Sequence, residues 1–169
     1  PCYRETKALL NGAGQPGDSF ELPLGPAKAS GCFIHLKSAN GIEWFFLENK
    51  PFFDRPGVYQ ERGAVYPDNE SRFLFLSKAV VHLITSGGYV PDVVHVHDWQ
   101  VAMVPLLLQH ESGIAKGQGR SIRSCLTIHN LAYQGVFPPG VFELTNLPWH
   151  LFNHEGVEFY GQFNFLKAG

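Results

Sequence analysis

The run with the clearest potential for chemistry is His95-Val-His-Asp98. On a β-strand, side chains alternate between faces, so His95 and His97 lie on one face and Asp98 on the other. Two imidazoles on one face are able to hold a metal ion, which with Asp98 makes a metal-dependent hydrolase one interpretation. The next residues, Trp99-Gln-Val101, add no further ligand. The alternative is that both histidines are half-buried and hydrogen-bond to neighbouring backbone, and this interpretation is favoured for His95.

Asp98 and Trp99 also fit a site for a polar ligand. A carboxylate where a strand ends and a helix begins is positioned to contact such a ligand, or else only to cap the helix. Trp99 is suited to stacking on the apolar face of a sugar ring, and equally to core packing. His129 and Asn130 have two interpretations as well. Asn130 either caps the end of the strand beside a hydrogen-bonded histidine, or both side chains project into the same crevice as Asp98.

Alternating helices and hydrophobic strands must position these residues. The predicted order is helix, strand, helix, glycine-rich loop and strand, over 69–86, 91–97, 99–111, 113–119 and 122–129. Asp68 is a candidate cap of the first helix, Gly87-Gly88 ends it, and Pro105 is expected to kink the second. Hydrophobic strands separated by helices form a parallel sheet, and ligands bind at the carboxyl ends of its strands. We therefore expect Asp98 and His129 to meet at one edge of the sheet.

The flanking segments carry weaker patterns. Asn40-Gly41 tolerates positive φ between two strand-like runs and predicts a β-hairpin near residues 32–47. Glycine and proline predict turns and loop over 11–31, and turn residues predict a loop over 49–68. A last helix is expected over 157–168.

The composition excludes several classes of protein. The 169 residues include 13 Lys and Arg against 15 Asp and Glu, a formal net charge of −2, and 44% are hydrophobic. This chain is too balanced in charge for electrostatic binding to nucleic acid or a membrane surface, and too apolar for a disordered tail. No apolar run approaches the ~20 residues that a transmembrane helix needs. We expect one domain with neither nucleic acid nor membrane as partner.

Three long stretches resemble the bacterial glycogen synthases and plant starch synthases, which use nucleotide-activated glucose. They are Asp92-Val-Val-His-Val-His-Asp-Trp-Gln100, Leu126-Thr-Ile-His-Asn-Leu-Ala-Tyr-Gln-Gly-Val-Phe137 and Phe163-Asn-Phe-Leu-Lys-Ala-Gly169. Supporting stretches are Phe53-Asp-Arg-Pro-Gly57, Tyr66-Pro-Asp-Asn69 with Arg72-Phe73, and Leu147-Pro-Trp149. The resemblance runs in order over nearly the whole chain from about residue 44.

The resemblance implies an α/β fold, a Rossmann-like parallel sheet with helices on both faces, as the amino-terminal half of a GT-B glycosyltransferase. It implies transfer of glucose from ADP-glucose to the non-reducing end of an α-1,4-glucan, with retention of configuration and with neither metal nor other cofactor. By motif position, Asp98 and His129 are the catalytic residues around the transferred glucose, and Tyr66, Trp99 and Asn130 bind the acceptor. It also implies a location in the bacterial cytoplasm, or in the plastid of a plant.

Two parts of such an enzyme have no counterpart here: the first strand with its Lys-x-Gly-Gly-Leu loop, and the carboxy-terminal nucleotide-sugar domain. We therefore expect 1–169 to be a single partial domain, inactive alone, with that second domain as its partner and with a sheet edge or apolar face exposed. UDP-glucose stays open as the donor. The alternatives are a non-catalytic carbohydrate-binding fragment and the metal-dependent hydrolase with His95, His97 and Asp98.

Overall fold

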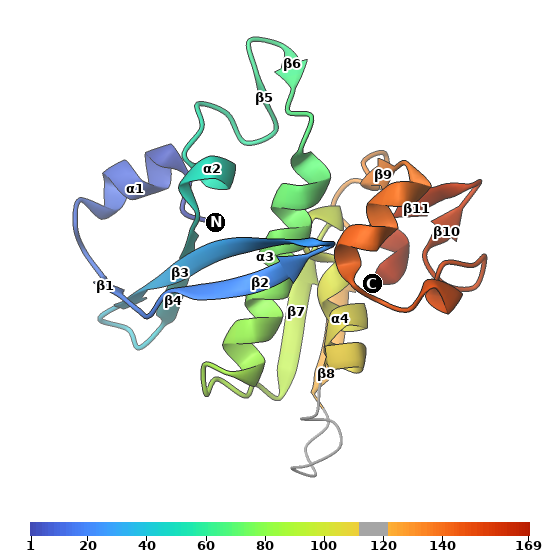
Figure 1. Ribbon diagram of the computed structural model, residues 1–169. Coiled ribbons are helices and arrows are strands. Elements are labelled where there is room, and N and C mark those ends of the chain that lie inside the picture. Colours follow the sequence, from blue (N-terminus) through green and yellow to red (C-terminus); the bar gives the residue numbers. More distant parts are fainter. Residues whose placement is uncertain (112–121) are drawn as a thin grey trace.

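Figure 1 shows the computed structural model, whose described residues are 1–111 and 122–169. The long helix α3 (Asn69–Thr85) runs through the middle and packs against α4 (Met103–Glu111). An antiparallel sheet crosses α3, and the parallel strands β7 (Val93–His97) and β8 (Arg123–Thr127) lie beside it. The loop predicted at 113–119 lies outside the described residues. No helix within the described part is long and apolar enough to cross a membrane.

Strands β7 and β8 confirm the predicted parallel pairing. Their register runs from Val93 opposite Arg123 to His97 opposite Thr127, so the two carboxyl ends are adjacent. Val94 and Val96 are buried in the core, whereas His95 and His97 point to the opposite face and are exposed. Period-two alternation therefore separates an apolar face, which holds the strand in the core, from a face that presents imidazoles.

The helices that flank β7 begin differently from the prediction. Asp68 precedes α3 as expected, but its carboxylate makes no cap hydrogen bond and pairs with Arg55 instead. The segment predicted as one helix over 99–111 is a 3₁₀ turn, η1 (Trp99–Val101), followed by α4. This division places Pro105 in the first turn of α4, where a backbone N–H has no intrahelical partner, so the proline costs no hydrogen bond.

The antiparallel sheet is built around β3 (Ala27–Lys37). Its pairing with β4 (Glu43–Glu48) confirms the predicted hairpin. The loop predicted over 11–31 is wrong in part, because β1 (Gln15–Pro16) and β2 (Phe20–Leu24) also pair with β3. Alternate side chains of β2 turn inward, a period-two pattern that Pro23 conceals in the sequence. Since β2 is an edge strand, it tolerates a residue without an N–H.

The helix predicted over 157–168 is wrong. The chain instead forms β10 (Glu158–Phe159) and β11 (Gln162–Asn164), and β11 also pairs with β9 (Val136–Phe137). Tyr160 and Gly161 join β10 to β11 with φ of 49° and 77°. Two consecutive residues with positive φ make a tight hairpin turn and interrupt a right-handed helix.

Short elements complete the chain. The loop predicted over 49–68 contains a helical turn and a small hairpin, and 3₁₀ turns occur among the short strands and loops of 136–169. Their bounds are α1 (Arg4–Leu10), α2 (Lys50–Phe53), β5 (Gln60–Glu61), β6 (Ala64–Val65), η2 (Pro139–Thr145), η3 (Trp149–Leu151) and η4 (Leu166–Ala168).

Phenylalanine fills much of the core that joins these elements. Fully buried rings come from α2, α3, η2, β11 and the residue after β11, at Phe53, Phe73, Phe75, Phe142, Phe163 and Phe165. Burial of each such side chain contributes about 1.5–3 kcal/mol to stability. The core therefore ties the carboxy-terminal turns to α3, and so holds both sides of the region where β7 and β8 end.

Candidate functional site

A pocket of about 690 Å³ lies at the carboxyl ends of β7 and β8. Three segments line it: 59–70 before and at the start of α3, 98–100 after β7, and 130–137 after β8. Its volume is within the range of small-molecule sites. Four of the residues predicted for the site border this pocket, namely Tyr66, Asp98, Trp99 and Asn130.

Asp98 joins the ends of the two strands. Its N–H donates to the Thr127 carbonyl at 2.9 Å, and its Oδ1 accepts from the N–H groups of His129 at 2.7 Å and Asn130 at 3.4 Å. It makes no cap hydrogen bond to η1, so its interpretation as only a helix cap is wrong. Its backbone, at φ 58° and ψ −177°, occupies a region nearly restricted to glycine, which costs about 1–3 kcal/mol. Such strain is typical of residues whose position serves a site.

Trp99 is packed mainly as a core residue. It is buried, and its ring meets that of Phe73 edge-on with centroids 4.9 Å apart and lies 5.8 Å from that of Phe137. Two tyrosines that the sequence analysis did not propose for the site border the same pocket and are more exposed than Trp99. Tyr59 is 43% exposed and Tyr133 is 68% exposed. Only Tyr133 had a signal in the sequence, since it lies within the long stretch after β8.

Gly135 fixes the position of Trp99, and we expect Gly135→Ala to destabilise the protein. A Cβ at this position lies 2.4 Å from Cε3 of Trp99, and the residue has φ +63°. The clash and the backbone conformation together should cost about 1–3 kcal/mol, measured by chemical denaturation. Gly63→Ala is the matched control, because Gly63 has φ +84° but nothing within 4 Å of such a Cβ. Equal losses in both variants would contradict a role for the Trp99 contact.

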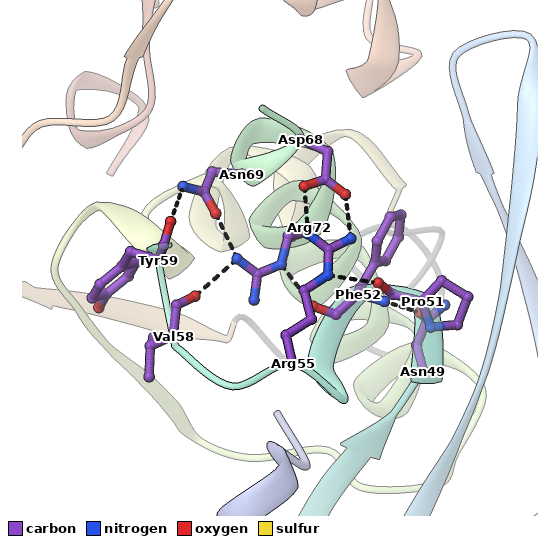
Figure 2. Close-up of polar contacts among 9 residues, drawn as sticks. All are labelled: Asn49, Pro51, Phe52, Arg55, Val58, Tyr59, Asp68, Asn69 and Arg72. Carbon is purple, nitrogen blue, oxygen red and sulfur yellow. Dashed lines mark hydrogen bonds and ion pairs between the residues drawn. The ribbon is translucent and has the colours of Figure 1, made fainter. Parts of the chain in front are cut away.

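Tyr66 is held by two arginines and borders the pocket. The guanidinium carbons of Arg55 and Arg72 lie 4.8 and 4.9 Å from the centre of its ring. Arg55 also donates to both carboxylate oxygens of Asp68, at 2.7 and 2.6 Å (Figure 2). Burial raises the pKa of Asp68, but the hydrogen bonds and charge of Arg55 outweigh it, and the pKa is lowered. The pair stays ionised at neutral pH and fixes the segment that carries Tyr66.

The ring of His129 lies outside the pocket, whereas Asn130 borders it. His129 Nε2 is 3.0 Å from His97 Nδ1 on the exposed face of the strand pair. Asn130 Oδ1 accepts from the N–H of Ala132 at 3.0 Å and closes a local turn. The structure therefore brings the main chain of both residues against Asp98, but only Asn130 faces the predicted crevice.

The three histidines make hydrogen bonds to side chains. His95 Nε2 lies 2.7 Å from Thr127 Oγ1, and the rings of His95 and His97 are 4.2 Å apart. Both are exposed, so the expectation of half-buried rings bonded to backbone is wrong. Over residues 1–111 and 122–169, no three His, Cys, Asp or Glu side chains are grouped to hold a metal ion. The hydrolase interpretation receives no support from this geometry.

Comparison with known proteins identifies the family. The model of the starch synthase catalytic domain matches residues 4–169. The chain belongs to the starch synthase catalytic domain family. It is 38% identical to the glycogen synthase of Myxococcus xanthus over 174 residues, which cover 100% of this chain and 35% of that protein. It is 44% identical to the glycogen synthase of Opitutus terrae over 150 residues, which cover 89% of this chain and 31% of that protein.

A solved starch synthase shows the same fold. The catalytic domain of starch synthase IV from Arabidopsis thaliana, bound to ADP and acarbose, matches with a TM-score of 0.73 and 24% identity. The match covers 92% of this chain and 32% of that one. The resemblance in the sequence motifs and the α/β fold class are thus confirmed. The chain spans about a third of the length of the curated relatives it matches.

Proposed function

We propose that this chain is the acceptor-side part of a glucosyltransferase that extends an α-1,4-glucan with glucose from ADP-glucose. The observation that carries the proposal is the pocket where β7 and β8 end, in a chain of the starch synthase catalytic domain family. Tyr59, Tyr66 and Tyr133 border this pocket, and aromatic rings suit the apolar faces of a glucan. The solved relative is bound to ADP and acarbose, which supports an ADP-linked donor.

Asp98 is the proposed electrostatic partner of the transferred glucose. A glucosyl transition state has the character of an oxocarbenium ion, so a fixed carboxylate nearby stabilises its positive charge. The two backbone N–H groups that bond to Asp98 hold this carboxylate in place before the reaction. His129 follows at the end of β8 and is the second proposed catalytic residue. Transfer with retention of configuration and without a cofactor is part of the proposal.

The chain by itself is proposed to be inactive. Because it spans about a third of each relative, we propose that a second, nucleotide-sugar domain completes the site in a two-domain synthase. That domain supplies the groups that neutralise the diphosphate leaving group. We propose a bacterial cytoplasm or a plant plastid as its location.

Radiolabelled ADP-glucose and maltoheptaose test the proposal directly. A two-domain synthase that contains this chain should elongate the acceptor, and nuclear magnetic resonance of the product should show α-1,4 linkages. UDP-glucose in a parallel reaction identifies the donor. The isolated chain should give no elongation. Elongation by the isolated chain would contradict the need for a second domain, and no elongation by the complete synthase with either donor would contradict the function itself.

A further inference from the structure

Arg72 of α3 is a buried cation to which the proposed reaction gives no role. None of its surface is exposed, and it does not border the pocket. Its guanidinium donates to the carbonyl oxygens of Phe52 at 2.7 Å and Val58 at 2.8 Å, and to Oδ1 of Asn69 at 2.5 Å. Figure 2 shows that one side chain thereby holds both ends of the segment 52–58.

Burial of this cation is costly. None of its three acceptors is a carboxylate, and Nη2 has no hydrogen-bond partner among the described residues. Burial lowers the pKa of Arg72, and the charge of Arg55 lowers it further. The rings of Tyr66 and Phe73, 4.9 and 5.3 Å away, offset part of this cost. An apolar side chain of similar volume avoids the cost altogether, so stability alone does not explain an arginine here.

The segment that Arg72 holds leads directly into one wall of the pocket. Val58, whose carbonyl accepts from Arg72, precedes Tyr59. Asn69 also links Arg72 to Tyr59, since its Oδ1 accepts from Arg72 and its Nδ2 donates to the Tyr59 carbonyl at 3.0 Å. On the pocket side, the Tyr59 hydroxyl accepts from Nε2 of Gln100 at 2.7 Å. Tyr59 is thus fixed through its main chain by Arg72 and through its hydroxyl by Gln100.

We propose that Arg72 is a positioning residue for the acceptor: by fixing the segment 52–58 and Asn69, it sets the place of Tyr59 in the pocket and so the affinity for glucan. This inference rests on the proposed function, because the ligand of the pocket is taken to be an α-1,4-glucan. Arg72 acts through Tyr59 and away from the reacting atoms. Its removal therefore changes binding of the acceptor more than the rate of transfer.

Arg72→Lys in the two-domain synthase tests this with maltoheptaose as acceptor. Lysine keeps the positive charge but lacks the planar fork that reaches three acceptors at once. We expect the KM for maltoheptaose to rise about tenfold, with kcat and the KM for ADP-glucose within about twofold of wild type. A fall in kcat with an unchanged KM for maltoheptaose would overturn the proposal.

A double-mutant cycle tests whether Arg72 acts through Tyr59. Tyr59→Ala alone should also raise the KM for maltoheptaose about tenfold, and Arg72→Lys added to it should raise that KM by no more than about twofold again. Independent effects would multiply to about 100-fold in the double variant, and that result would overturn the proposal.

Two further variants separate positioning from general stability. Lys78 is a second buried cation of α3, but it donates to the Pro23 carbonyl and to Asn146 Oδ1. Lys78→Met should lower Tm and leave the KM for maltoheptaose unchanged. Asn69→Asp keeps an acceptor for Arg72 and removes the donor to Tyr59, so it should raise that KM about fivefold.

Asn69→Asp also carries the test if Arg72→Lys does not fold, and an unchanged KM in it overturns the inference. Failure of the proposed function gives a different result, because wild-type synthase would then not elongate maltoheptaose at all.

Discussion

Replacement of Asp98 by Asn in the two-domain synthase is expected to lower kcat about 100-fold, with the KM for glucan within about threefold of wild type. Asparagine keeps an oxygen for the N–H groups of His129 and Asn130, and its side chain has nearly the shape of aspartate. The variant therefore preserves the link between the strand ends and removes only the negative charge. Initial rates with radiolabelled ADP-glucose, over a range of glucan concentrations, separate kcat from KM.

Asp98→Ala separates the charge from the link between strands. Alanine leaves the N–H groups of His129 and Asn130 without their acceptor and occupies the strained backbone less readily. We expect a loss of about 1–3 kcal/mol of stability, by chemical denaturation, in addition to the loss of kcat. Wild-type kcat in Asp98→Asn together with a destabilised Asp98→Ala would assign Asp98 a structural role and remove it from the chemistry.

The parts of the fold that follow from local periodicity were predictable. α3 and β7 each carry a strong repeat of apolar side chains, and the structure places them close to the expected bounds. The helix expected over 157–168 is wrong because the chain turns at Gly161. That glycine adopts φ 77° after Tyr160 at 49°, and this turn decides the local structure.

In the site, too, the features that follow from local sequence were predictable, and those that depend on distant residues were not. Asp98 follows β7 directly and Asn130 comes three residues after the end of β8, so the rule for parallel sheets predicted that they meet at one edge. The role of Tyr59 was not predictable, because it depends on Gln100, 41 positions later in the sequence. Arg72 lies in a stretch that supported the family resemblance, but its three acceptors become apparent only when the chain is folded.

His129→Ala is expected to lower kcat about 100-fold in the two-domain synthase, in an assay at saturating donor and acceptor. The ring of His129 lies outside the acceptor pocket, with Nε2 3.0 Å from His97 Nδ1. That contact orients the ring and leaves Nδ1 for the proposed contact with the transferred glucose. His97→Ala removes that orientation and should cost about tenfold. His95→Ala is the matched control on the same exposed face, since its bond goes to Thr127, and it should stay within about threefold of wild type. Equal losses in all three variants would mean that the row of imidazoles acts as a unit, and that result would contradict a specific role for His129.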